Sequence, residues 1–134
     1  MTKYAAFGTL LKRGGTTIAN VTNISGPGLS LDTEDVTSME STGAWEEVVA
    51  TILRSGEISV DLAWDPAAAT HKNSAGGMLN DMTIRTATTY SIVFPGSVTW
   101  SFTAYVTGWE PAAPVDGALT VAAKLKITGQ PTLT

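Results

Sequence analysis

The sequence predicts a mainly β domain, built as a sandwich or a barrel, with one flanking α-helix. Threonine occurs 21 times and β-branched residues are spread over the whole chain, a composition that favours pleated, half-buried strands. Several segments also alternate apolar and polar side chains with the two-residue period of a strand. The length of 134 residues and the 43% of hydrophobic residues match one domain with one core. We therefore expect a single domain over residues 1–134.

The composition excludes several classes of function. The chain has no cysteine and one histidine, which excludes disulfide scaffolds, cysteine-ligated metals and thiol nucleophiles. Its net charge of −4 does not suit a protein that binds the phosphate backbone of a nucleic acid. No apolar run approaches the ~20 residues that span a bilayer, and no apolar stretch of a signal peptide follows Met1. We expect no metal, no cofactor, no membrane span and no secretion signal.

Turn residues divide the N-terminal part of the chain into short strands. Residues 7–12 and 16–25 read as two strands, because the Gly-Gly pair at 14–15 suits a hairpin turn between them. The Gly-Pro-Gly sequence at 26–28 ends the second strand. We expect a further short strand within residues 30–38.

The segment that follows, residues 39–56, allows two interpretations. Five apolar side chains recur at the i, i+3, i+4, i+7, i+8 spacing of a helix. They are Trp45, Val48, Val49, Ile52 and Leu53. The same side chains would suit a long arm between two strands that buries them against another subunit. Periodicity alone leaves both interpretations open.

The clearest strand covers residues 57–64. One of its faces is apolar and the other carries Glu57, Ser59 and Asp61. Residues 97–109 alternate in the same way, with a hydroxyl-rich second face. We expect the apolar faces of these two strands to lie in the core. The residues concerned are Ile58, Val60, Leu62, Trp64, Val98, Trp100 and Phe102.

A helix is expected loosely within residues 67–82, between the strands. Asp65 suits the N-cap and Pro66 suits the first helical position. Gly76 and Gly77 oppose the helix, because each glycine costs about 1 kcal/mol relative to alanine in a helix interior.

Two more strands complete the expected sheet. Residues 88–94 alternate, and the Pro-Gly pair at 95–96 is a tight-turn dipeptide that connects them to the long strand at 97–109. Residues 118–128 alternate again, with lysine and threonine on the polar face.

No group of side chains has the spacing of an active site. Glu57 and Asp61 share one strand face at roughly 13 Å, which is too far apart for the paired carboxylates of a glycosidase. The acids at residues 32–40 lack the alternating spacing of a calcium loop. No acid or serine lies at a sequence spacing from His71 that would indicate a catalytic pair, so we expect a solvated or partly packed histidine.

Several segments, taken in order, resemble a known family. Residues 43–47 read Gly-Ala-Trp-Glu-Glu, residues 53–57 read Leu-Arg-Ser-Gly-Glu, and the strand after them ends in Trp-Asp-Pro at 64–66. This succession, followed by the hairpin at 90–96, is similar to the major tail tube proteins of long-tailed, siphovirus-type bacteriophages. The resemblance covers most of residues 4–134.

The resemblance implies a structural subunit and no enzyme. It implies hexameric rings of this protein, stacked head to tail into a hollow virion tail that delivers viral DNA without binding it specifically. It also implies assembly in the host cytoplasm, with tape measure, tail terminator and tail-tip proteins as partners. Some members carry an immunoglobulin-like domain after the tube domain, which we do not expect here because the sequence ends at Thr134.

Candidate site residues follow from the residue pattern together with the assembly that the resemblance implies. We expect the 39–56 arm to supply the interface between subunits or rings. Its candidate residues are Trp45, Glu46, Glu47, Val48, Val49, Ile52 and Leu53. Glu57, Ser59 and Asp61 are the candidates for the channel wall. Residues 32–65 hold nine acids and one base, so we expect part of this acidic region to meet bases on an adjacent subunit or ring.

A second function is compatible with the same fold class. A carbohydrate-binding or adhesin-type sandwich would use an exposed Trp45 or Trp109 as a sugar platform and would remain monomeric. Such a module would normally carry a secretion signal, and rings or tubes seen by electron microscopy would exclude it.

Overall fold

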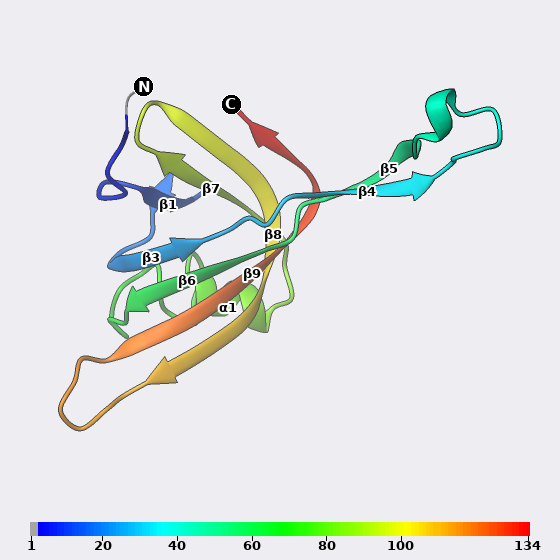
Figure 1. Cartoon of the computed structure of the whole chain (residues 1–134). Helices are drawn as coiled ribbons and strands as arrows, with labels where there is room; N and C mark the ends of the chain where they lie inside the picture. Colours follow the sequence, from blue (N-terminus) through cyan, green and yellow to red (C-terminus); the bar gives the residue numbers. More distant parts are fainter. Residues whose placement is uncertain (1–2) are drawn as a thin grey trace.

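The computed structural model describes residues 3–134, so that Met1 and Thr2, the start of the expected domain, lie outside it. Seven strands form one antiparallel sheet in the order β2-β1-β7-β8-β9-β6-β3, which curls into a half-barrel (Figure 1). The mainly β, barrel-like class with one helix is therefore confirmed. The strands of this sheet are β1 (Leu10–Arg13), β2 (Thr16–Thr17), β3 (Val21–Ser25), β6 (Glu57–Ala63), β7 (Thr88–Phe94), β8 (Val98–Ala112) and β9 (Thr120–Leu133).

The two predicted tight turns are present. Arg13 pairs with Thr16 across the Gly-Gly turn of β1 and β2, and Phe94 pairs with Val98 across the turn of β7 and β8. The strand expected over residues 16–25 is instead split into β2 and β3. In the connection between them, the Ala19 N–H donates to Thr70 Oγ1 at 3.2 Å instead of to a neighbouring strand.

The core lies on one face of this sheet. Strand β6 alternates buried and exposed side chains along its length. The residues of the expected core that the structure buries are Ile58, Val60, Leu62 and Phe102. Residues of β1, β7 and β9 complete this core, among them Leu11, Tyr90 and Leu125.

Three residues expected in the core are only half-buried: Trp64, Val98 and Trp100. Trp64 lies just beyond the end of β6, where its ring packs edge-on against Trp109 with centroids 6.3 Å apart. Val98 and Trp100 lie at the start of β8, next to the β7–β8 turn. There the ring of Trp100 packs against Phe94, at a centroid distance of 5.3 Å. All three positions are at strand ends, where the sheet gives less cover than at its middle.

The helix is much shorter than the range expected for it. Helix α1 covers Met78–Thr83, and the residues from Pro66 to Gly76 form turns. Gly76 has a φ of +95°, and a Cβ on Gly77 would lie 1.9 Å from the carbonyl oxygen of Lys72. The two glycines therefore interrupt the helix completely, because a continuous helix would require another backbone path at both positions.

His71 anchors these turns to the sheet and is completely buried, contrary to the expectation of a solvated or partly packed side chain. Its Nε2 lies 2.7 Å from the Ala19 carbonyl oxygen, which can only accept, so Nε2 carries the proton. Its Nδ1 accepts from the Asp65 backbone N–H at 3.3 Å. The ring thus joins the turns to the β2–β3 connection in a single tautomer.

A buried carboxylate anchors α1. Asp81 accepts hydrogen bonds from Arg13 Nε at 2.7 Å, Arg13 Nη2 at 2.8 Å and the Tyr90 hydroxyl at 2.5 Å. Burial raises the pKa of Asp81, but the hydrogen bonds from Arg13 and Tyr90 outweigh it and hold this pKa below its usual value. Burial and the bond to Asp81 raise the pKa of Tyr90. This network fixes α1 to strands β1 and β7.

The remaining two strands form a separate hairpin that projects from the half-barrel (Figure 1). Strand β4 (Ser30–Asp35) pairs with β5 (Val48–Arg54), and a short 3-10 helix, η1 (Thr42–Ala44), lies in the connection. The arm expected over residues 39–56 therefore includes β4 as well, and from here on the arm means residues 30–54. The helical interpretation of residues 39–56 is wrong, because the β-branched run of β5 pairs with β4 instead.

Candidate assembly surfaces

The arm exposes an unusual amount of apolar surface. All seven residues of β5 are exposed, on both faces of the ribbon. The large hydrophobic side chains exposed on the arm are Leu31, Val36, Met39, Trp45, Val48, Val49, Ile52 and Leu53. A two-stranded ribbon has no layer behind it and cannot bury its own side chains. Exposed apolar surface of this extent is typical of a contact with another molecule.

Polar bonds give the arm a defined shape. Arg54 Nε donates to Asp32 Oδ2 at 2.8 Å, and the Val36 N–H donates to the Glu47 carbonyl oxygen at 2.9 Å. At the tip, the Glu47 N–H donates to Thr37 Oγ1 at 2.8 Å. Hydrogen bonds from Thr37 lower the pKa of Asp35. The arm is therefore a hydrogen-bonded hairpin whose large apolar side chains remain exposed.

Glycines form a narrow neck between the arm and the half-barrel. Gly26 has a φ of +104°, and a Cβ there would lie 2.6 Å from the Glu57 carbonyl oxygen. Gly56 has a φ of +70°, and a Cβ there would lie 2.6 Å from the Gly28 carbonyl oxygen. Backbone meets backbone at both positions, so a larger residue would displace the two chain segments that connect the arm.

The structure brings together all the residues that the sequence assigned to an interface. They are Trp45, Glu46, Glu47, Val48, Val49, Ile52 and Leu53, and each is exposed on the arm. Trp45 follows η1 and has 77% of its surface exposed. Their contact with another subunit remains a prediction.

The residues assigned to a channel wall also share one surface. Glu57, Ser59 and Asp61 are exposed on the outward face of β6. The register of β6 and β9 places Lys126 opposite Glu57 and Lys124 opposite Ser59. This face therefore carries both signs of charge, which the acids of β6 alone did not indicate.

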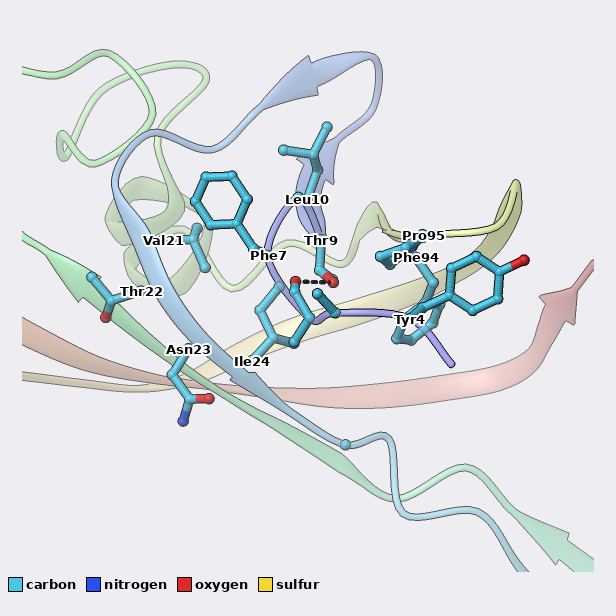
Figure 2. A pocket seen from close by; sticks show the side chains of 14 residues that line it. Tyr4, Phe7, Thr9, Leu10, Val21, Thr22, Asn23, Ile24, Phe94 and Pro95 are labelled. Atoms are coloured by element: carbon cyan, nitrogen blue, oxygen red, sulfur yellow. Dashed lines mark hydrogen bonds between the residues drawn. The ribbon is translucent and has the colours of Figure 1, made fainter. Parts of the chain in front are cut away.

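Sequence reasoning missed a groove beside the N-terminal segment. The groove has a volume of about 810 Å³ and lies between residues 4–10, β3 and the end of β7 (Figure 2). Aromatic and aliphatic side chains dominate it, and Phe7 has 98% of its surface exposed. A strand was predicted over residues 7–12, whereas β1 begins only at Leu10. The signal that could have identified the groove is the pair of aromatic residues, Tyr4 and Phe7, outside any alternating pattern.

The structure also bears on three other functions: a metal site, a membrane span and a sugar-binding surface. Within residues 3–134, no group of three or more acids and histidines is placed to hold a metal ion. No helix in the described part of the chain is long and apolar enough to cross a membrane. Trp109, a candidate sugar platform, is half-buried against Trp64.

Comparisons with known proteins place the chain among tail proteins. The family model described as "Lambda phage tail tube protein, TTP" matches residues 4–134. A search of curated proteins finds no match. Among solved structures, a chain from the virion of a native gene transfer agent (GTA) particle has a TM-score of 0.79 at 19% identity, over 98% of this chain and 99% of that chain.

Two further structures share the fold. A chain from the tail of an empty GTA particle, with C6 symmetry, has a TM-score of 0.75 at 19% identity, over 98% of this chain and 99% of that chain. A chain from the sheath/tube terminator of an extracellular contractile injection system, PVC, has a TM-score of 0.75 at 12% identity, over 100% and 98% of the two chains.

The family and these neighbours are structural proteins of tails, not enzymes. With an arm of exposed apolar residues and a family match over nearly its whole length, the chain is a structural component of a phage-type virion tail. The chain belongs to the lambda phage tail tube protein family.

Proposed function

We propose that this protein forms six-membered rings that stack head to tail into a hollow tail tube for genome delivery. The observation that carries the proposal is the arm, a hairpin whose large apolar side chains remain exposed in the described chain. Residues 1–134 act as one tail-tube domain. The C6 symmetry of the GTA tail, whose subunit has the same fold, supports the ring size.

A ring that closes, and a stack that grows, both need two different complementary surfaces on each subunit. The arm is one such surface, with Trp45 and the strand β5 as its apolar part. The half-barrel offers others, because β7 begins at Thr88, opposite Ala104, and no strand of the described residues pairs with the rest of β8 on that side. Strand β3 is the opposite edge of the sheet. Free edges of this kind pair readily with a strand of another chain.

The outward face of β6 lines the channel in this proposal. Glu57, Ser59 and Asp61 lie there beside Lys124 and Lys126. A wall of mixed charge lets DNA pass without binding it specifically, because no continuous basic strip follows the phosphates. Assembly takes place in the host cytoplasm, and tape measure, tail terminator and tail-tip proteins are the further partners.

Electron microscopy of the concentrated protein tests the assembly. We expect rings and tubes from the natural sequence. Leu53→Asp, on the arm, should abolish them, because a charge in an apolar contact must lose its water. Val115→Asp is the matched control, since Val115 is fully exposed but lies in the β8–β9 turn. Absence of rings and tubes from the natural sequence at every concentration would contradict the proposal.

Thiol labelling tests the channel face separately. The chain has no cysteine, so Ser59→Cys introduces a single reactive group on β6. In tubes, a small maleimide should label this thiol while a polymer-linked maleimide should not. Equal labelling by both reagents in intact tubes would place this face outside the channel.

A further inference from the structure

We infer that the groove beside the N-terminal segment receives the arm tip of a second copy of this chain, with Trp45 as the inserted side chain. This inference rests on the proposed self-assembly and adds the surface to which the arm binds.

The groove has the size and the lining for an aromatic side chain. Its volume of about 810 Å³ exceeds that of any single side chain, and Tyr4, Phe7, Ile24 and Phe94 contribute to its walls (Figure 2). The ring of Tyr4 rests on the β7–β8 turn, where a Cβ on Gly96 would lie 3.3 Å from Tyr4 Cζ. Aromatic rings prefer to meet other rings edge to face or offset, which suits an indole among these side chains.

Both surfaces are exposed in the single chain. Phe7 is 98% exposed in the groove, and Trp45 is 77% exposed on the arm. Met39, at the same tip, is fully exposed as well. Burying these side chains against one another removes apolar surface from water on both sides, which favours association.

The position of the groove excludes a contact within one chain. The arm tip points away from the half-barrel, and the N-terminal segment lies at the end remote from the arm (Figure 1), while the groove beside that segment extends to Gly26 at the neck. The polar bonds of the arm and the tight neck at Gly56 keep the arm directed away from it. The arm can therefore reach only the groove of another copy. Such a contact joins two different surfaces, so it repeats along a stack of rings.

Charge favours the same pairing. The arm contains six acids and one base, Arg54, and Arg54 already pairs with Asp32. Glu46 and Glu47 directly follow Trp45. No acid or base lines the groove, but Lys3 adjoins it, and Lys12 lies on the same side of β1 as the groove residue Leu10. The acids of the arm tip thus approach Lys3 and Lys12, while Asp61, which accepts from the groove residue Asn23 at 3.3 Å, is an acid beside the groove.

Disulfide cross-linking tests the contact directly, because the natural chain has no cysteine. The double variant Phe7→Cys, Trp45→Cys is assembled and then mildly oxidised. We expect a ladder of covalent dimers, trimers and longer chains, at least tenfold more abundant than from Val115→Cys, Trp45→Cys. Val115 is as exposed as Phe7 but lies away from the groove. Each single-cysteine variant should give no species longer than a dimer.

Microscopy of the same samples separates this inference from the proposed function. Tubes without the ladder would overturn the groove as the arm's binding site and leave self-assembly standing. No rings or tubes from the natural sequence would overturn the proposed function and this inference with it.

A second measurement does not depend on disulfide geometry. Phe7→Ala and Trp45→Ala should each raise the protein concentration needed for assembly by about tenfold. The double variant should raise it by far less than the product of the two, because both changes remove one contact. Both side chains are exposed, so the fold should tolerate either change. Fully multiplicative effects would show that the two residues do not meet.

Discussion

Strands β5 and β6 follow each other in the chain and have the same length, yet their surroundings differ completely. β5 reads VVATILR and is exposed at all seven positions, whereas β6 reads EISVDLA and buries Ile58, Val60 and Leu62. The more apolar strand is therefore the exposed one. β6 has β3 and β9 as neighbours and a packed core behind it, while β5 has only β4. Apolar residues stabilise the fold in β6, and in β5 they are available for another molecule.

The largest difference should appear when a side chain is truncated in each region. Phe102→Ala, in the core, should lower the free energy of unfolding by about 3–5 kcal/mol. Leu53→Ala, on the arm, should change it by less than about 0.5 kcal/mol, because 79% of this residue is exposed. Urea unfolding of the monomer measures both. Similar losses from the two variants would show that the arm packs on the half-barrel in solution.

A smaller effect is expected from the buried carboxylate of the half-barrel. Asp81→Asn removes the charge that Arg13 and Tyr90 bind. This change should lower the free energy of unfolding by about 1–3 kcal/mol. Because the folded pKa of Asp81 lies below its unfolded value near 3.9, its contribution is complete above about pH 4. It is lost as the pH falls through the lower folded pKa.

The pH dependence provides the check on Asp81. Unfolding curves between pH 2 and pH 7 should show a decline below about pH 4 in the natural protein that is smaller in Asp81→Asn. Asp35→Asn is the matched control. Hydrogen bonds from Thr37 lower the pKa of Asp35 too, but it is exposed on the arm. A decline that Asp81→Asn leaves unchanged would assign the acid sensitivity to other carboxylates.

A substitution in the neck should lower the free energy of unfolding less than Asp81→Asn does. Gly56→Ala forces an alanine to a φ of +70° and toward the Gly28 carbonyl oxygen, at a cost of about 1–2 kcal/mol. It should also change the direction of the arm and lower the yield of tubes. Gly14→Ala is the control, with a φ of +63° and nothing within 4 Å of its Cβ. Equal tube yields from the two variants would show that the neck does not set the arm's direction.

The smallest expected effect is that of salt concentration on the yield of tubes. Exposed ion pairs contribute about 0–1 kcal/mol each, and the Debye length falls below about 8 Å above ~0.15 M salt. We expect tube yield to decline moderately over this range if acids of the arm meet bases of a neighbour. Tubes that form equally well or better at 1 M salt, measured by sedimentation, would assign the contact to apolar burial alone.

The alternation of apolar and polar residues was sufficient to predict much of the half-barrel. The strands at 57–64 and 97–109 alternate because one face is buried, and their turns carry glycine where the backbone requires it. The sequence did not predict how much of the expected helix would be lost. The loss depends on the close approach of Gly77 to the Lys72 backbone, and this approach exists only in the folded turns. The burial of His71 likewise depends on Ala19, 52 residues away in the sequence.

The arm and the groove were less accessible to sequence reasoning. The apolar residues of β5 fit helical and strand periods equally, and only the pairing with β4 decides between them. The apolar residues themselves suggested an arm that contacts another subunit as one of two interpretations, and the resemblance favoured this one, whereas periodicity did not. The groove arises where residues 4–10 pass between β3 and the end of β7, segments far apart in the sequence, so no local pattern indicates it.

The most direct test of the account is to remove the arm. Residues 30–54 are replaced by an Asn-Gly turn, which suits the antiparallel segments that the neck connects, and the product is examined by electron microscopy and urea unfolding. The account predicts a folded monomer with an unfolding midpoint close to that of the natural chain, and no rings or tubes at any concentration. Tubes of normal appearance, or a chain that no longer folds, would contradict the separation of folding from assembly.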